Sequence, residues 1–151
     1  MASTFVKLDV HLIFHVKTTS TLIRQEDLAS LFAYMGGIIR SLNGIPYIIG
    51  GMPNHIHILT SLPKTMSMSD FVKKVKIDTS LWIKTINPSY RTFAWQDGYA
   101  AFSVSASILE KTKTYIQNQA EHHRKRTFKE EVIMFLEKHG VPYDKQYLFP
   151  E

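Results

Sequence analysis

The spacing of apolar residues changes along the chain between a period of two and a period of three to four. In residues 4–17 every second residue is apolar, which predicts a β-strand with one face turned to the core. Residues 46–51 and the stretch from Pro53 to Pro63 predict two more strands, with a turn at Gly50-Gly51 and Pro53 that favours an antiparallel hairpin. The core face of the first strand is expected to hold Leu8, Val10, Leu12, Phe14 and Val16.

Two segments show the three- and four-residue steps of amphipathic helices, residues 25–43 and about 67–85. Asn43-Gly44 supplies a C-terminal stop for the first, and Ser67 or Ser69 can cap the start of the second. Their expected apolar faces comprise Leu28, Leu31, Phe32, Met35, Ile38, Ile39 and Leu42 in the first helix, and Phe71, Val72, Val75, Leu81 and Trp82 in the second.

The second half of the chain continues with β-like stretches at 93–95 and 99–105, separated by the turn dipeptide Asp97-Gly98. Helices are expected at about 107–124 and 128–139. The order βαββαββαα predicts an α+β fold in which helices cover a central antiparallel sheet. Nothing resembling a linker or an internal repeat interrupts the pattern, so residues 1–151 are expected to form a single domain.

Composition limits the chemistry. The 151 residues are 44% hydrophobic, enough for one domain with a core, and they include no cysteine. A metal ion would therefore need histidine, carboxylate, amide or water ligands. No apolar run approaches the roughly 18 residues of a membrane span, and the first residues lack a signal-peptide pattern. We expect a cytoplasmic protein.

Positive charge is concentrated in two segments. The net charge is +5 with neutral histidines and the pI is near 9.4. Such an excess favours a phosphate-rich partner, although a basic segment can also be only a solvated face. The candidate DNA-binding residues are Lys73, Lys74 and Lys76 in one segment, and Arg124, Lys125 and Arg126 in the other.

The segment PNHIHIL alternates two histidines with two isoleucines. On a strand, His55 and His57 share one face, about 6.5 to 7 Å apart at the backbone, and Ile56 and Ile58 share the other. Both imidazoles can then reach one ion. A hydrogen-bonded structural pair is the alternative, and a third ligand on an element across the strand would favour a metal site.

Tyr115 and Gln119 lie four residues apart in the segment YIQNQ, so a helix places them on one face. A phenol and an amide on a helix are commonly surface or packing residues. Next to a bound divalent ion, however, a tyrosine can act as a nucleophile towards a phosphodiester, because the ion polarises the phosphate and favours the phenolate.

Four segments together resemble the small single-tyrosine HUH transposases of bacterial insertion sequences. They are PNHIHIL after Gly-Gly, WQDGYAAFSVS, YIQNQ, and the closing run HHRKRTFKEEVIMFLEKHGVPYDKQYLF. Each is short, but all four occur in the same order at compatible spacings, and the similarity covers nearly the whole chain. The resemblance implies the HUH endonuclease fold, a ferredoxin-like sandwich on a central antiparallel sheet.

The resemblance also implies a site and partners. His55 and His57 match the HUH pair and would bind Mg²⁺ or Mn²⁺, Gln119 matches the third ligand, and Tyr115 matches the nucleophile. The implied enzyme is a homodimer that cuts and rejoins single-stranded DNA at insertion-sequence ends through a 5′-phosphotyrosine, often recognising a hairpin. It also implies active sites shared in trans, and a location at the bacterial or archaeal nucleoid.

Two other classes of phosphoesterase and a nucleic-acid-binding module are the alternatives. A histidine-triad hydrolase would need a third histidine at position 59, which is Leu59. Two-histidine phosphodiesterases need two separated His-x-Thr or His-x-Ser motifs, which the chain lacks. A non-catalytic nucleic-acid-binding module that stacks bases on exposed aromatic residues stays open.

The remaining histidines are expected to have no direct role in such a site. His11 and His15 are expected to be partly buried structural residues of the first strand. His122 and His123 are expected to belong to a solvated basic helix end. No motif supports Asp70, Asp78, Glu130 or Glu131 as metal ligands.

Overall fold

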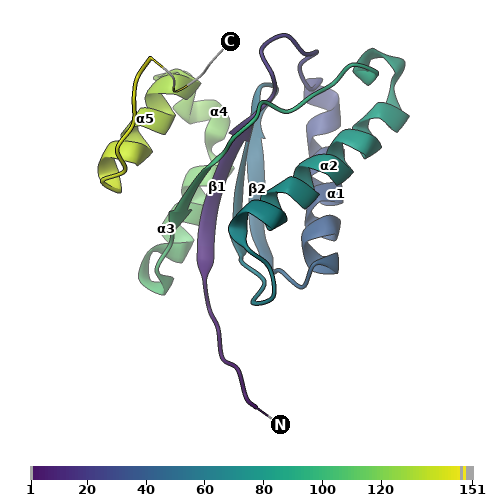
Figure 1. The fold of residues 1–151 in the computed structure, drawn as a ribbon. Helices are drawn as coiled ribbons and strands as arrows, with labels where there is room; N and C mark the ends of the chain where they lie inside the picture. Colours follow the sequence, from purple (N-terminus) through teal and green to yellow (C-terminus); the bar gives the residue numbers. More distant parts are fainter. Residues whose placement is uncertain (1, 147, 149–151) are drawn as a thin grey trace.

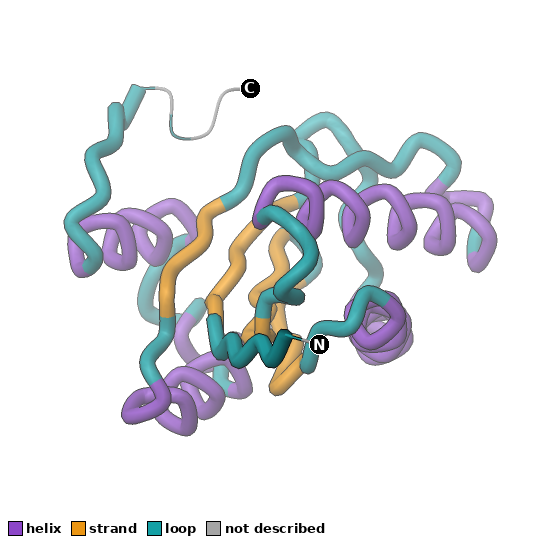
Figure 2. Tube along the Cα trace, turned by 60° about the horizontal axis from the view of Figure 1, so that its bottom comes forward, coloured by secondary structure: helices purple, strands orange, loops and turns teal. Residues whose placement is uncertain are grey.

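A computed structural model describes residues 2–146 and 148. A four-stranded antiparallel sheet in the order β2-β3-β1-β4 forms its centre, and helices cover both faces (Figure 1, Figure 2). The α+β fold class is confirmed. The strands are β1 (Asp9–His15), β2 (Pro46–Met52), β3 (His55–Ser61) and β4 (Ala100–Ser103). The α-helices are α1 (Leu28–Ser41), α2 (Met68–Ile86), α3 (Leu109–Gln117), α4 (Gln119–His122) and α5 (Phe128–Lys138), with 3-10 turns at Gln25–Asp27, Pro88–Tyr90 and Ala106–Ile108.

The larger core lies between the sheet and helices α1 and α2. The predicted apolar face of α1 lies there, with Phe32 and Leu42 only partly buried. Ile56 and Ile58 enter from β3 with no exposed surface. In α2, Phe71, Val72 and Val75 are buried, but Leu81 is 63% exposed, so its predicted core position is wrong. Ile83, two residues further along α2, is fully buried in this core instead.

The opposite face of the sheet is covered by α3, α4 and α5, drawn on the left of Figure 1. Val132, Phe135 and Leu136 of α5 pack on Ile13 and Phe102. A separate small cluster joins Leu59, Val104 and Ile116 beneath α3. Antiparallel pairing sets Ile13 opposite His57 and His15 opposite His55, so residues of this face mix apolar and imidazole side chains.

Gly50 and Gly51 lie within β2, and the turn is formed by Pro53 and Asn54, so the predicted Gly-Gly turn is wrong. A Cβ atom on Gly50 would lie 2.7 Å from the carbonyl oxygen of Ile116. The glycine therefore lets α3 approach β2 next to His57, the residue that pairs with Gly50. Gly51 has φ of 156°, and a Cβ there would meet the His55 carbonyl oxygen at 2.3 Å.

Two predicted strands are shorter than expected. The first begins at Asp9 and leaves Leu8 54% exposed, because its partners β3 and β4 end opposite at Ser61 and Ser103. Residues 93–95 form only one isolated bridge, between Val16 and Trp95. The Trp95 indole N–H donates to Thr79 Oγ1 at 3.1 Å, so this segment packs into the core across the end of the sheet.

The predicted helix 107–124 is interrupted. It begins as the 3-10 turn Ala106–Ile108, α3 ends at Gln117, and Asn118 leaves helical geometry with φ of −101° and ψ of 31°. The short α4 then turns the chain towards α5. Among the described residues, no helix combines the length and apolar character required to span a membrane.

The close approach of α3 to β2 yields a stability prediction for Gly50→Ala. The added methyl group must displace Ile116 and its backbone, so we expect a loss of about 1–3 kcal/mol in the free energy of unfolding, as for other overpacked sites. Urea unfolding measures the change. Gly37→Ala is the matched control, since Gly37 lies in α1 with open space around its Cβ position and should gain about 0.5–1 kcal/mol. Equal effects of the two substitutions would contradict the close approach.

Candidate active site

The two histidines of β3 form the floor of a buried polar site. Both side chains have no exposed surface, and their ring centroids lie 5.2 Å apart. Their predicted sharing of one strand face is confirmed, because their neighbours Ile56 and Ile58 enter the opposite core. Residues from α3, α4 and α5 close the site from above.

Tyr115 of α3, Gln119 of α4 and Glu131 of α5 converge on the histidine pair. Gln119 Oε1 lies 3.0 Å from His55 Nε2, and Glu131 Oε1 lies 3.0 Å from His57 Nε2. The Tyr115 hydroxyl donates a hydrogen bond to Glu131 Oε2, and its ring centroid is 6.3 Å from that of His57. Despite the break at Asn118, the side chains of Tyr115 and Gln119 point in the same direction. Both reach the cluster around the histidine pair.

Glu131 is the residue that sequence reasoning missed. No motif marked it as a metal ligand, yet it lies at the centre of the site, fully buried beside His55 and His57. One ligand atom from each of these three residues lies within 4.8 Å of the other two, as in a metal site. The available signal was its position in α5, where a carboxylate falls on the apolar face between Phe128 and Phe135.

His122 and His123 are also part of the site, and their assignment to a solvated helix end is wrong. His123 Nε2 lies 3.2 Å from Gln119 Oε1 and 3.1 Å from Glu131 Oε1. The ring of His122 stacks on Tyr115 with centroids 4.1 Å apart. His123 contacts Glu131 of α5 and His122 stacks on Tyr115 of α3, so both are partly buried and neither is a solvated end of the helix.

Contacts behind the histidines fix their orientation. His11 Nε2 lies 2.8 Å from His57 Nδ1, and the Asn54 side-chain oxygen lies 2.7 Å from His55 Nδ1. The predicted structural role of His11 agrees with this contact and with its exposed fraction of 1%. Such outer contacts set which ring nitrogen of a metal-binding histidine faces the ion.

Burial shifts the ionisation of these groups. Loss of solvation, together with nearby His57, lowers the pKa of His55 to about 3, so its imidazole is neutral near pH 7. Desolvation and the hydrogen bond to Glu131 raise the pKa of Tyr115 well above that of a free phenol. Desolvation opposes the charge on Glu131, but hydrogen bonds from His57, Tyr115 and Gln119 hold the pKa of this carboxyl well below its usual range.

The donor set fits a divalent cation. A neutral imidazole has one N–H, yet the two ring nitrogens of His55 face two oxygens, those of Asn54 and Gln119. When the N–H is on Nδ1 and donates to the Asn54 oxygen, Nε2 presents its lone pair to the site, as a metal ligand must. The 3.0 Å N···O separations also match neighbouring ligands of an octahedral ion with bonds of about 2.1 Å. His55, His57 and the oxygens of Gln119 and Glu131 can hold such an ion.

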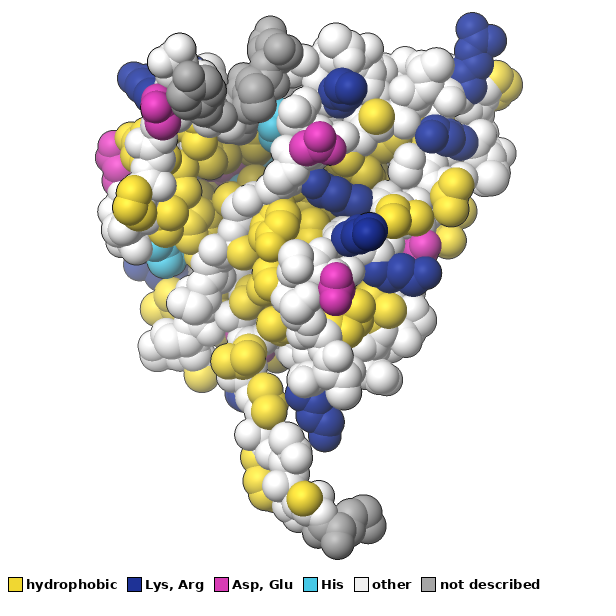
Figure 3. Space-filling view, in the orientation of Figure 1, with side chains coloured by type: hydrophobic (Ala, Val, Ile, Leu, Met, Phe, Trp, Pro, Cys, Tyr) yellow, Lys and Arg dark blue, Asp and Glu magenta, His cyan; other side chains and the backbone are white. Residues whose placement is uncertain are grey.

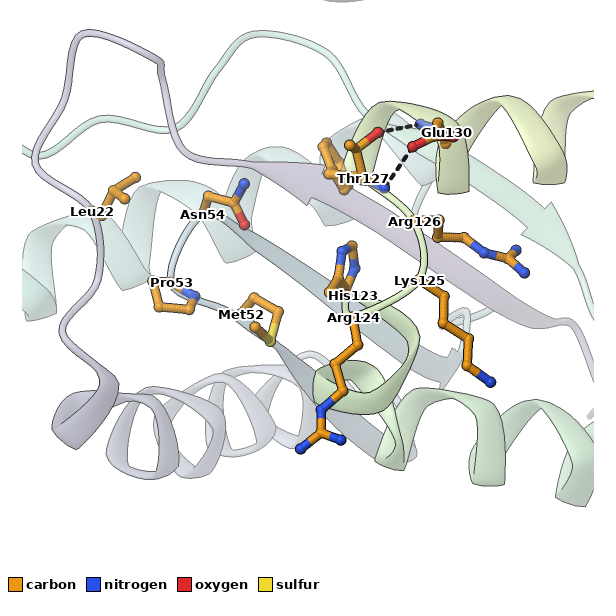
Figure 4. A pocket seen from close by; sticks show the side chains of 11 residues that line it. Leu22, Met52, Pro53, Asn54, His123, Arg124, Lys125, Arg126, Thr127 and Glu130 are labelled. Carbon is orange, nitrogen blue, oxygen red and sulfur yellow. Dashed lines mark hydrogen bonds between the residues drawn. The ribbon is translucent and has the colours of Figure 1, made fainter.

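A basic pocket of about 560 Å³ opens beside this cluster (Figure 4). It lies between the β2–β3 turn and the segment 123–127, and its lining includes Asn54 and His123, which both contact site residues. Arg124, Lys125 and Arg126 also line it. This basic segment therefore borders the site.

The other predicted DNA-binding segment lies on α2, which covers the opposite face of the sheet. Figure 3 shows basic side chains gathered over this side of the molecule. The Lys76 ammonium donates to the carbonyl oxygens of Gln96 and Gly98, at 2.9 and 2.6 Å, and so holds the loop before β4. Lys74 pairs with Asp78 at 3.3 Å. The site and these lysines do not share a surface.

The buried histidines predict acid sensitivity of the metal-free protein. His55 and His11 both have pKa values lowered by burial, whereas the unfolded chain takes up these protons near pH 6.5. As the pH falls below about 6.5, protonation favours the unfolded chain, and the free energy of unfolding should fall with a slope approaching about 1.4 kcal/mol per pH unit for each such histidine.

Urea unfolding with a chelator, from pH 8 down to pH 5, measures this dependence. The free energy should be nearly constant above pH 7, and His11→Asn should make the decline shallower. A stability that rises on acidification would contradict neutral buried histidines.

Comparison with known proteins gives the family. The family model described as "Transposase IS200 like" matches residues 4–119. A solved structure from Deinococcus radiodurans R1, assigned as a transposase, is similar with a TM-score of 0.60 and 22% identity, over 79% of this chain and 95% of that chain. A REP-associated tyrosine transposase bound to a REP hairpin is similar with a TM-score of 0.59 and 13% identity, over 82% of this chain and 73% of that chain. No curated protein matches this chain in sequence. The chain belongs to the IS200-like transposase family.

Proposed function

We propose that this chain is a metal-dependent transposase that cleaves and rejoins single-stranded DNA through a covalent link to Tyr115. The observation that carries the proposal is the convergence of the Tyr115 hydroxyl and the His55–His57 pair on one buried cluster, in a chain of this family. The expected ion is Mg²⁺ or Mn²⁺, held by His55, His57 and Gln119. When bound, the ion would polarise the scissile phosphate and stabilise the charge that develops on it.

The nucleophile is the Tyr115 oxygen. It attacks the phosphorus of the scissile phosphodiester, a bond between phosphorus and the phenolic oxygen forms, and the bond to the 3′-oxygen breaks. The phenol loses its proton and the leaving 3′-oxygen gains one, either directly or through solvent. The products are a 5′-phosphotyrosine and a strand with a free 3′-hydroxyl. Attack by a second 3′-hydroxyl on the phosphotyrosine reverses the chemistry and joins two strands, so no nucleotide cofactor is required.

The substrate is proposed to be single-stranded at the cut and to form a hairpin beside it, as at insertion-sequence ends. His55, His57 and Glu131 are fully buried, which favours a single extruded backbone that approaches along the pocket lined by Arg124, Lys125 and Arg126. A similar fold in a hairpin-bound tyrosine transposase supports this choice. Work at the bacterial or archaeal nucleoid is part of the same proposal.

A non-catalytic DNA-binding module is the second candidate, and covalent chemistry separates the two. Exposed aromatic residues such as Tyr99, 42% exposed, would serve such a module. That alternative does not require a tyrosine and a carboxylate to be buried against a histidine pair.

Tyr115→Phe tests the nucleophile. The variant loses one hydroxyl and keeps the ring that stacks on His122, so folding and hairpin binding should persist while the covalent adduct disappears entirely. Single-stranded oligonucleotides from the flanks of the gene, incubated with Mn²⁺ and run on a denaturing gel, give the readout.

Tyr34→Phe is the matched control, because Tyr34 lies on α1 and stacks on Trp82, on the other face of the sheet. It should form adduct at the rate of the wild type. Adduct formation that persists in Tyr115→Phe would assign the chemistry to another tyrosine, and its absence in the wild type would favour the non-catalytic module.

The arrangement of one chain also bears on the proposed homodimer. The Tyr115 hydroxyl bonds to Glu131, which also contacts His57 of the same chain, so we propose that a dimer, where it forms, uses Tyr115 in cis with its own histidine pair. Mixing Tyr115→Phe chains with His55→Ala, His57→Ala chains, under conditions where subunits exchange, should then leave cleavage at the background of the parents. Recovery of cleavage in the mixture would instead support the sharing in trans that the resemblance implies.

A further inference from the structure

Helix α5 lies outside the part of the chain that matches the family model, which ends at residue 119. It nevertheless brings the fully buried carboxylate of Glu131 between the histidine pair and Tyr115. The family match therefore says nothing of this carboxylate, and the role inferred for it below rests on the proposed function.

Glu131 is buried without a basic partner. Within residues 2–146 and 148, its ion-pair contacts are the imidazoles of His55, His57 and His123, at 3.6, 3.0 and 3.1 Å, and no lysine or arginine pairs with it. Burying an ionised carboxylate is costly unless a cation or several hydrogen bonds compensate the charge. The surroundings of Glu131 supply hydrogen bonds, and a divalent ion would supply the missing positive charge.

The two carboxylate oxygens face different partners. Oε1 faces the imidazole nitrogens of His57 and His123, on the side where an ion would bind. Oε2 accepts the hydroxyl of Tyr115 and, at 3.1 Å, the side-chain N–H of Gln119. One carboxylate thus touches both the ion site and the nucleophile.

The position of Glu131 is fixed by the packing of α5. Thr127 and Glu130 form a capping box that starts the helix, and Val132 and Phe135, which follow Glu131 in α5, are buried. The ring of Phe128 lies 4.3 Å from that of His55. A side chain held on three sides presents its oxygens at constant positions, as a ligand or an orienting group must.

We propose that Glu131 is an additional ligand of the divalent ion through Oε1 and, through Oε2, the group that positions the Tyr115 hydroxyl for attack. The same residue then couples ion binding to nucleophile placement, and α5 is a component of the active site. Loss of the carboxylate should weaken ion binding in the absence of DNA and should also slow adduct formation at saturating DNA, with little change in DNA affinity.

Glu131→Gln tests both parts, because glutamine keeps the volume and one oxygen but loses the charge. Calorimetry with Mn²⁺ and no DNA should show at least about a tenfold loss of affinity relative to the wild type. The rate of adduct formation at saturating oligonucleotide should fall by about tenfold or more, while the oligonucleotide dissociation constant changes less than about twofold. Glu137→Gln is the matched control, on the same helix but exposed and bonded to Tyr143, and it should behave as the wild type in each assay.

Glu131→Asp covers the case in which the glutamine variant does not fold. It keeps the charge but withdraws the carboxylate by one methylene, so both Mn²⁺ affinity and adduct rate should again fall. Wild-type affinity and rate in a folded Glu131 variant would overturn the proposal while leaving the proposed function intact. A wild-type protein that binds Mn²⁺ in a Glu131-dependent way but forms no adduct would instead overturn the proposed function and the positioning role, and would leave the ion site in place.

Discussion

The alternation of side chains along β3 is the constraint on which the rest of the structure depends. Because successive side chains point to opposite faces, one strand delivers Ile56 and Ile58 to the apolar core and His55 and His57 to the polar site. A shift of one residue in its pairing with β1 would exchange the two sets and destroy both. Helices α1 and α2 stabilise that register by packing on Ile56 and Ile58, and α3 to α5 pack around the imidazoles on the other face.

Burying the polar groups on one face of the sheet costs free energy, and specific hydrogen bonds offset that cost. Five residues of the site are fully or largely removed from water, namely His55, His57, Tyr115, Gln119 and Glu131. Their hydrogen bonds connect strand β3 to helices α3, α4 and α5. Buried networks of this kind are favourable only when each group is satisfied. The ligand atoms of His55, His57 and Glu131 lie within 4.8 Å of one another, close enough to hold one metal ion.

Much of this arrangement follows from local patterns, and the parts that do not have long-range causes. Periodicity predicted the helices α1 and α2, the histidine face and the shared face of Tyr115 and Gln119, while the roles of these two residues came from the family resemblance. Glu131 was missed because its partner His57 is 74 residues away and no local motif marks the pair. The break at Asn118 was missed because no glycine or proline announces it. His122 and His123 were misplaced because their partial burial depends on contacts with Tyr115 and Glu131, which the basic composition of the segment does not indicate.

A covalent link between a DNA strand and Tyr115 can be measured directly, because the sequence places this tyrosine in a short tryptic peptide. Trypsin cleaves after Lys113 and Arg124, so the peptide 114–124 contains Tyr115 as its one tyrosine. The wild-type protein can be incubated with a hairpin-flanked single strand and Mn²⁺, digested with nuclease and trypsin, and analysed by mass spectrometry. The account predicts a 5′-phosphonucleotide on this peptide, localised to Tyr115 by fragmentation. A nucleotide found on any other peptide would contradict it.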